Sequence, residues 1–180
     1  MVNSLIVAHR ISAMLPPAQR PEHTEGYEGF FHLISQNGSV DQTEMEFIIR
    51  DHDMMKFHQK KELLTSVVDL LNKEYGQSVI KLEMTDKYYN MRQKIEPVMY
   101  VVDLARQAMI MAGVEPKIKA IRGGTDGARL SYMGLPCPNI FAGGLNFHGP
   151  YEFVPVQYME KAVEVILNIC KLAINLKKEA

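Results

Sequence analysis

The chain has 180 residues, a formal net charge of -1 and a hydrophobic fraction of 47%. That length suits one domain or two small ones with a sizeable core. The near-neutral charge argues against binding to nucleic acid or to a membrane surface, and no apolar run reaches the ~18 residues that span a bilayer. Because two cysteines cannot build a disulfide framework, we expect a cytoplasmic protein.

Residues 1–84 predict a small α+β unit. Residues 2–15 have a helical period, with an apolar face made of Val2, Leu5, Ile6, His9 and Ala13. A Gln-Asn-Gly turn signal at 36–38 separates two segments that favour strands, 29–35 and 43–51. Such segments on either side of a turn predict a β-hairpin with one buried face.

A second helix and a further strand complete this unit. Residues 54–75 have the clearest helical pattern, which Gly76 ends, and the charged run 60–62 is interpreted as a solvated face. Residues 78–84 alternate like a half-buried strand. The order α-β-β-α-β is that of a ferredoxin-like unit without its first strand. Since the first helix also opens without an evident N-cap, we expect the chain to be part of a longer protein.

The remaining residues, 94–180, predict the order α-β-α-β-α. Helices and strands are expected to alternate at 97–112, 117–121, 126–133, 137–142 and 156–176. The last helix is expected to bury a face that consists of Met159, Ala162, Val163, Ile166, Ile169, Cys170 and Ala173. Strands that alternate with helices indicate part of a parallel or mixed α/β sheet.

The candidate functional residues are concentrated in the run 121–155. Gly123-Gly124 follow an expected strand, and paired glycines there let the backbone approach a ligand and direct N–H groups toward it. Arg122 stands at the mouth of this turn, where a guanidinium can hold a carboxylate with two hydrogen bonds. His148 lies in a loop flanked by Gly149 and Pro150. From the residues alone, plain turns and a surface histidine remain the alternatives.

The chain resembles the peptidase T family, tripeptide aminopeptidases of the dinuclear-zinc exopeptidase clan. The resemblance covers nearly the whole chain and is carried by the stretches TEGYEGF (24–30), IIRD (48–51), YYNMR (88–92), IRGGTDGA (121–128), MGLPCPN (133–139), HG (148–149) and MEKAV (159–163). It implies an α/β catalytic domain interrupted by a smaller lid domain that mediates homodimerisation. Residues 1–92 would then be a partial ferredoxin-like α+β lid lacking its first strand. Residues 93–180 would be the C-terminal part of the α/β zinc-exopeptidase catalytic domain.

The resemblance also implies roles in binding a small peptide substrate. The substrate's carboxylate and backbone would contact Arg122, Gly123, Gly124 and Thr125. Two residues of the hinge between the lid and the catalytic domain, Asn90 and Arg92, would also contact the substrate. For the two hinge residues, local hydrogen bonding within the hinge or at the surface is the alternative interpretation.

By the same resemblance, His148 is the one metal ligand in this chain, whereas two zinc ions are expected per full-length subunit. The family's His-x-Asp pair, its Glu-Glu pair with the general base and its further acidic ligands have no counterpart here. A catalytic zinc needs about three protein ligands, so the isolated chain is expected to be inactive, with no catalytic residue of its own.

The sequence therefore leaves three competing functions. The first is a fragment of a zinc-dependent aminopeptidase that removes the N-terminal residue from tripeptides by metal-activated water. The alternative is a non-catalytic dimerisation or binding module, or a decayed peptidase that lacks the metal site. A carboxypeptidase or deacylase of the same clan is the third, and the peptidase T-specific motifs argue against it.

Overall fold

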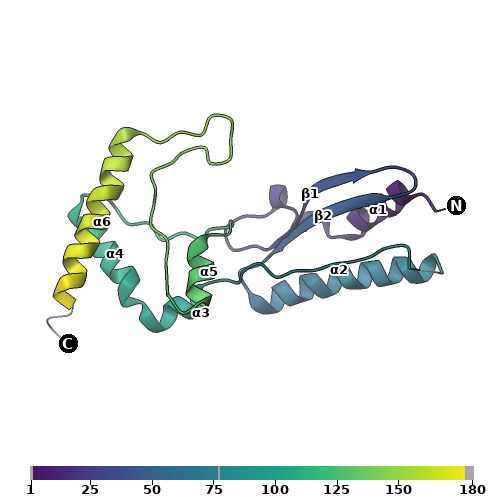
Figure 1. Ribbon diagram of the computed structural model, residues 1–180, viewed down its shortest axis with the longest axis horizontal. Coiled ribbons are helices and arrows are strands. Elements are labelled where there is room, and N and C mark those ends of the chain that lie inside the picture. Colours follow the sequence, from purple (N-terminus) through teal and green to yellow (C-terminus); the bar gives the residue numbers. More distant parts are fainter. Residues whose placement is uncertain (1, 77, 177–180) are drawn as a thin grey trace. The chain divides into compact units, whose positions relative to one another are not determined.

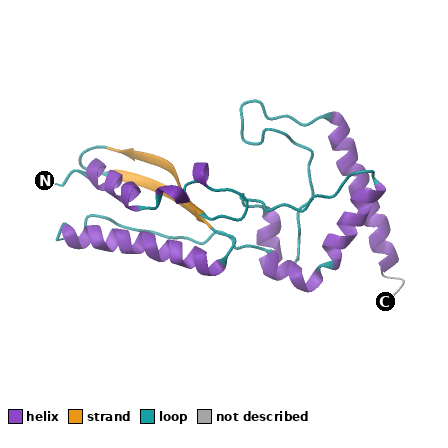
Figure 2. Ribbon diagram, turned by 180° about the vertical axis from the view of Figure 1, so that it is seen from behind, coloured by secondary structure: helices purple, strands orange, loops and turns teal. Residues whose placement is uncertain are grey.

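The computed structural model describes residues 2–76 and 78–176, and it divides into two compact units (Figures 1 and 2). The first unit consists of Met1–Lys87 and Ala120–Arg122, and the second of Tyr88–Lys119 and Gly123–Ala180. No helix in the described part of the chain is both long and apolar enough to cross a membrane.

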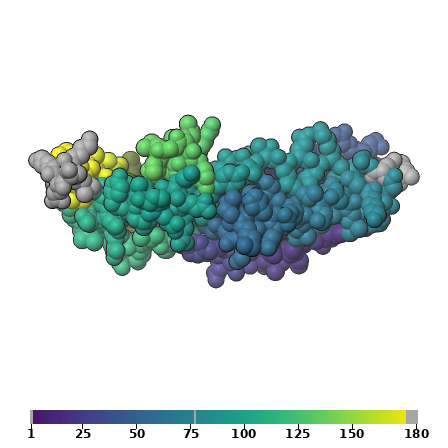
Figure 3. Space-filling model, turned by 90° about the horizontal axis from the view of Figure 1, so that it is seen from below, coloured from purple at the N-terminus to yellow at the C-terminus, as the bar shows by residue number. Residues whose placement is uncertain are grey.

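The first unit has two helices and a hairpin. Its elements in chain order are α1 (Ser4–Met14), the 3-10 turns η1 (Pro17–Gln19) and η2 (Pro21–His23), β1 (Phe30–Gly38), β2 (Thr43–Arg50) and α2 (Met54–Glu74). One core lies between the two helices and one face of the hairpin, and its buried members are Val7, Ile11, Leu15, Phe31, Leu64, Val67 and Leu71. In the space-filling view, side chains of α2 (blue) cover one side of this unit (Figure 3).

The predicted hairpin is confirmed, with β1 and β2 antiparallel, but the predicted turn is wrong. Gly38 is still paired, opposite Thr43, and the turn lies at 39–42, where the Ser39 N–H donates to the Gln42 carbonyl at 2.8 Å. A Cβ on Gly38 would lie 2.3 Å from the Thr43 hydroxyl oxygen. This glycine therefore allows a close approach of the strands, which explains why the Asn-Gly signal is misleading here.

Helix α1 forms where predicted but buries a different face. Val7, Ala8 and Ile11 are buried, whereas Leu5 and Ile6 are 38% and 55% exposed. The helix is apolar on more than one side, so its periodicity alone does not select the face that packs on the hairpin. Its N-terminus is also capped, contrary to the prediction: the Asn3 Oδ1 atom accepts a hydrogen bond from the Leu5 N–H at 3.0 Å.

Helix α2 agrees closely with its prediction, and Gly76 follows it with a positive φ of 67°. The interpretation of the charged run 60–62 as a solvated face is wrong at its first residue. Lys60 is buried, and its Nζ atom lies 2.9 Å from the Asp51 Oδ2 atom. The lysine is buried because the chain reverses at Asp51 and places a carboxylate opposite the core side of the helix.

The strand predicted at 78–84 is not formed. These residues run alongside α2 (Figure 1), and the Ile80 N–H and carbonyl are bonded to the side chain of Asn72 at 2.8 and 3.0 Å. Ile80 and Leu82 still pack against the core. A strand requires a ladder of backbone hydrogen bonds, and within the described residues the sheet contains only β1 and β2.

The second unit is helical. Its elements are α3 (Arg92–Ile95), the 3-10 turn η3 (Glu96–Val98), α4 (Tyr100–Met111), α5 (Asp126–Tyr132) and α6 (Val156–Leu176). The three longer predicted helices are thus confirmed. The strands predicted at 117–121 and 137–142 are not formed, and neither segment has a ladder partner in the described part of the chain. An isolated bridge joins Leu145 to Phe153.

The buried face of α6 differs from the predicted one. Val165 is fully buried, with Ile169 and Leu172 packed beside it against Ala108 of α4 and against Ala112, the C-cap of that helix. The predicted core residues Met159, Val163 and Ile166 are 52%, 56% and 48% exposed, and Cys170 is exposed as well. Ala108 and Ala112 have small side chains that leave room for Val165. Packing against α4 and its C-cap therefore determines which apolar side of α6 is buried.

Candidate functional site

Arg122, the predicted carboxylate-binding residue, belongs to the first unit. Its guanidinium donates two hydrogen bonds to one residue: Nη1 to the Thr24 carbonyl and Nη2 to the Thr24 Oγ1 atom, both at 2.5 Å. The guanidinium carbon lies 4.8 Å from the ring centroid of the buried Phe30, a distance at which cation–π attraction operates. The Nε atom is buried and has no hydrogen-bond partner among the described residues.

Side chains from the end of β2 fix the backbone on which Arg122 stands. Arg50 donates a short hydrogen bond from its Nη1 atom to the Arg122 carbonyl. The Nε2 atom of His52 lies 3.3 Å from the Ile121 carbonyl oxygen, and its Nδ1 atom lies 3.3 Å from the Tyr27 carbonyl oxygen. The position of the Arg122 guanidinium is therefore fixed by the hydrogen bonds to its backbone and by its contact with the Phe30 ring.

The electrostatic balance around Arg122 is unusual. The side chain is half-buried, yet among the residues described it takes part in no ion pair. The nearby carboxylate of Asp51 is 2% exposed and paired with Lys60. A partly desolvated cation without a counter-charge is costly, which makes Arg122 a candidate anion-binding group.

Gly29 is the point where two of the sequence motifs meet. A Cβ on Gly29 would lie 2.0 Å from the Asp51 Oδ2 atom and 2.5 Å from the Arg50 carbonyl oxygen. Only glycine leaves room for this approach. The stretches TEGYEGF and IIRD are thereby brought into contact, and both meet Arg122 of the RGG motif.

The remaining residues of the glycine turn lie in the second unit. Gly123 is an exposed bend. Gly124 faces the ring of Tyr88, and a Cβ there would lie 2.2 Å from the ring's Cζ atom. Thr125 occupies the N-cap position of α5 without a side-chain cap bond. Its Oγ1 atom instead accepts a hydrogen bond from the Asn139 Nδ2 atom at 3.1 Å.

Asn90 and Arg92 take part in local contacts of the second unit. The Asn90 Oδ1 atom accepts from the Arg92 N–H at 3.0 Å, and the Asn90 carbonyl accepts from the Tyr132 hydroxyl at 3.1 Å. The Nε atom of Arg92 lies 2.7 Å from the Glu96 Oε1 atom, with both side chains largely exposed. These contacts are local, and the predicted substrate contacts of both residues stay predictions.

His148, the predicted metal ligand, lies in the loop between Leu145 and Phe153. The residue is exposed and has a positive φ of 64°, and its backbone N–H donates to the Glu152 Oε2 atom at 2.9 Å. The described residues include no group of three or more His, Cys, Asp or Glu that could hold a metal ion. They do not fit a complete zinc site, which needs about three protein ligands.

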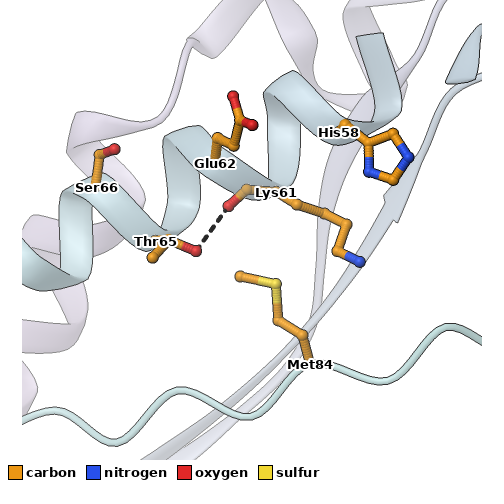
Figure 4. A pocket seen from close by; sticks show the side chains of 6 residues that line it. All are labelled: His58, Lys61, Glu62, Thr65, Ser66 and Met84. Carbon is orange, nitrogen blue, oxygen red and sulfur yellow. Dashed lines mark hydrogen bonds between the residues drawn. The ribbon is translucent and has the colours of Figure 1, made fainter. Parts of the chain in front are cut away.

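A shallow open depression in the first unit contains none of the predicted site residues. It is lined by His58, Lys61, Glu62, Thr65, Ser66 and Met84 (Figure 4). Its lysine is already engaged, because the Lys61 Nζ atom lies 2.8 Å from the Asp86 Oδ1 atom and 5.4 Å from the Phe57 ring centroid. We do not assign a ligand to it.

Sequence reasoning missed the surroundings of Arg122. Thr24, Phe30, Arg50 and His52 were not predicted as site residues, although the first three lie in stretches that carry the family resemblance. The signal was present in those stretches, but only the fold shows that 24–30 and 48–52 meet at the same guanidinium.

Comparison with known proteins first shows the class of protein that this chain is similar to. Residues 1–79 match the family model described as a peptidase dimerisation domain. The solved structures of aminopeptidase PepT from Bacillus cereus and of a tripeptidase from Staphylococcus aureus superpose with TM-scores of 0.60 and 0.62. Each is 17% identical, and they cover 93% and 94% of this chain and 44% and 45% of their own. The mixed α+β fold class is confirmed.

Curated proteins are similar to nearly the whole chain. Proteins named Peptidase T from Caldanaerobacter subterraneus subsp. tengcongensis and Halothermothrix orenii are 55% and 57% identical over 172 residues, which is 96% of this chain. The protein of the same name from Bacillus subtilis is 54% identical over 171 residues. The predicted resemblance to the peptidase T family is therefore confirmed. The chain spans 42% of the length of each of these relatives.

Proposed function

We propose that this chain provides the dimerisation unit and the substrate-carboxylate site of a zinc-dependent aminopeptidase that removes the N-terminal residue from tripeptides. The observation that carries the proposal is the half-buried guanidinium of Arg122, which lies on Phe30 and forms no ion pair among the described residues. A planar guanidinium binds a carboxylate through two parallel hydrogen bonds. The C-terminal carboxylate of a short peptide has the required charge and shape.

The residues after Arg122 are proposed to bind the peptide backbone. Gly123 and Gly124 lack side chains that would keep a ligand away from their N–H groups, and Thr125 follows them directly. Asn90 and Arg92 are proposed to contact the substrate from the hinge. Their present bonds to each other and to Glu96 are exposed and so are weak competitors for a ligand.

His148 is proposed to be one ligand of a zinc ion. The described residues offer no complete ligand set, so an ion bound by His148 would need further ligands from outside them. Peptide hydrolysis by the isolated chain is not expected. We also propose that residues 1–92 act as the dimerisation unit of a cytoplasmic homodimer and that 93–180 belong to the catalytic domain.

Binding and catalysis are tested separately on the purified chain. Trialanine is expected to shift the Arg122 side-chain Nε–Hε signal in NMR titration, whereas trialaninamide, which lacks the carboxylate, is not. Arg122→Met should abolish binding, and Arg106→Met, a change at an exposed arginine of α4, should leave it unchanged. Equal binding of both peptides would contradict the carboxylate site.

Zinc content and trialanine cleavage are measured on the same preparation. We expect less than stoichiometric zinc and no cleavage. Stoichiometric zinc together with cleavage would mean that residues interpreted as structural bind the metal, and the role given to His148 would then have to be revised.

A second candidate function is a non-catalytic dimerisation or binding module. It is favoured by the match of residues 1–79 to a peptidase dimerisation domain, which by itself requires neither metal nor substrate. Sedimentation equilibrium combined with the titration distinguishes the two functions. A stable dimer that binds neither peptide would support the module and exclude the carboxylate site.

A further inference from the structure

We infer that Thr24 is an internal surrogate for the substrate carboxylate, so that a peptide displaces Thr24 from Arg122 when it binds. This inference rests on the proposed function of Arg122. It gives Thr24 a role in setting the affinity and selectivity of the site. It also identifies the segment of the chain that must move when a peptide binds.

The geometry of the contact is that of a bidentate pair. Both terminal nitrogens of the guanidinium are bonded to oxygens of the same residue, the Thr24 carbonyl and Oγ1 atoms, each at 2.5 Å. A carboxylate presents two oxygens to a guanidinium in the same way. The Thr24 hydroxyl donates its own proton to the Arg20 carbonyl at 2.9 Å, so its lone pairs are directed toward Arg122.

Arg122 is the fixed partner of this contact. Its carbonyl is held by Arg50, the preceding carbonyl faces His52, and its guanidinium lies on the buried ring of Phe30. Moving the guanidinium would break the ring contact as well as the bonds to Thr24. A ligand is therefore expected to find the arginine in place.

Thr24 is the partner that can move. It ends the 3-10 turn η2 and precedes the exposed loop 25–28. Gly26 in this loop has a positive φ of 53°, and a Cβ added to it would meet no atom within 4 Å. The loop is therefore open at Gly26, and its contact with His52 is made by the next residue, Tyr27. Because the loop is exposed, water can bond to the two Thr24 oxygens after they leave the guanidinium.

Arg122 is expected to bind a carboxylate in preference to Thr24. The need to displace Thr24 nevertheless lowers the affinity of the site for the carboxylate. The charged guanidinium is the donor in both cases, but a carboxylate adds a full negative charge on the acceptor side, whereas the two Thr24 oxygens are neutral. A carboxylate can therefore replace them. Part of the gain is lost because the bonds to Thr24 must be broken. A peptide with further contacts along the glycine turn can compensate for this loss, whereas a small anion such as acetate cannot.

Thr24→Val tests the inference, with Thr24→Ser as the matched control. Valine keeps the shape of threonine and the backbone carbonyl but removes the hydroxyl acceptor, whereas serine keeps the hydroxyl. In NMR titration of the full chain with trialanine, we expect Thr24→Val to bind about tenfold more tightly than the unmodified protein, the effect of one hydrogen bond to a charged group. Thr24→Ser is expected to bind as the unmodified protein does.

The outcomes separate this inference from the function on which it rests. Equal or weaker binding by Thr24→Val, while Arg122→Met still abolishes binding, would overturn the surrogate role and leave the carboxylate site intact. Absence of trialanine binding in both the unmodified protein and Thr24→Val would overturn the carboxylate site itself, and the inference with it.

A measurement on the unmodified protein keeps the test valid if Thr24→Val fails to fold. Saturation with trialanine should shift the backbone and methyl signals of Thr24 along with the Arg122 Nε–Hε signal. Signals of Thr65, whose hydroxyl donates within α2 to the Lys61 carbonyl at 3.0 Å, should not move. A shift at Arg122 without one at Thr24 would contradict displacement.

Discussion

The two units differ in how many of their apolar side chains are buried. In the first unit, two helices and the hairpin bury one continuous core that includes the fully buried Leu71. In the second unit, the buried members of the core cluster are Ala108, Ala112 and Val165, while Val163 of the same helix is 56% exposed. Periodicity predicts the helices of both units equally well. Which side of a helix is buried depends on the partner that packs against it.

The largest effect is expected at the buried ion pair of the first unit. Lys60→Met leaves the Asp51 carboxylate, which is 2% exposed, without its cation, and breaking a buried pair typically costs 3–5 kcal/mol. We expect urea denaturation to show a loss of about 4 kcal/mol. Lys61→Met is the neighbouring control, since its pair with Asp86 is more exposed, and it should cost about 0.5 kcal/mol. Similar losses in both variants would show that the Lys60 pair is solvated.

The core of the first unit is tested at Leu71. This side chain has no exposed area, and Leu71→Ala should lower the free energy of unfolding by about 3 kcal/mol because it leaves a cavity. Leu70, its neighbour in α2, is 53% exposed, and Leu70→Ala should stay within about 0.5 kcal/mol of the unmodified protein. An equal loss at both positions would mean that the outer side of α2 is covered in solution.

One glycine in each unit lies so close to other atoms that an alanine in its place would meet them, and the two units differ in whether those atoms can move. In Gly29→Ala the new Cβ meets the backbone carbonyl of Arg50 at 2.5 Å, whereas in Gly124→Ala it meets the end of the Tyr88 ring at 2.2 Å. The ring can rotate away but the carbonyl cannot. We therefore expect Gly29→Ala to cost about 2 kcal/mol and Gly124→Ala less than about 1 kcal/mol, measured by thermal unfolding. The reverse order would contradict this argument.

The second unit is tested at two valines of α6. Val165→Ala removes two buried methyl groups and should cost about 1.5 kcal/mol, because the Val165 side chain is fully buried. Val163→Ala makes the same chemical change on the exposed side and should have an effect near zero. If Val163→Ala is the more destabilising of the two, another surface covers the outer side of α6 in solution.

The elements that sequence reasoning predicts well are those whose stability is local. Helix α2 has its Asp53 cap and its terminal Gly76 in the sequence itself, and its bounds agree with the prediction to within one residue. The segments 78–84 and 117–121 alternate as strands do, but a strand forms only where another offers a ladder. No local pattern supplies that information.

The candidate site shows the same limit. Arg122 is identified from the chemistry of its side chain and from its glycine neighbours, both of which are local. Its partners Thr24 and Arg50 are 98 and 72 residues away in sequence, and the sequence alone does not show which motif meets which. The buried pair of Lys60 and Asp51 was missed for the same reason, since it depends on how the chain reverses before α2.

The smallest expected effect is a pH dependence at the surface of the first unit. Two hydrogen bonds of 2.7 Å join the Arg10 guanidinium to the Glu74 carboxylate, and the bond from Arg10 holds the pKa of Glu74 below its usual value. A carboxyl whose folded pKa is lowered adds stability above its unfolded pKa, and this contribution disappears as the pH falls through the folded pKa. The window therefore lies below pH 4.5, the ordinary value for this group.

Glu74→Gln isolates this contribution from those of the other carboxyls. Urea midpoints are compared at about pH 6 and about pH 3, on either side of the window in which the carboxyl titrates. We expect the midpoint of Glu74→Gln to fall slightly less on acidification than that of the unmodified protein. Glu83→Gln is the comparison variant. The hydrogen bond from Lys81 also holds the pKa of Glu83 below its usual value, but the two side chains are 74% and 85% exposed, so solvent screens this pair more strongly and we expect a smaller effect. An unchanged pH response in Glu74→Gln would mean that the Arg10 contact joins α1 to α2 without adding measurable stability.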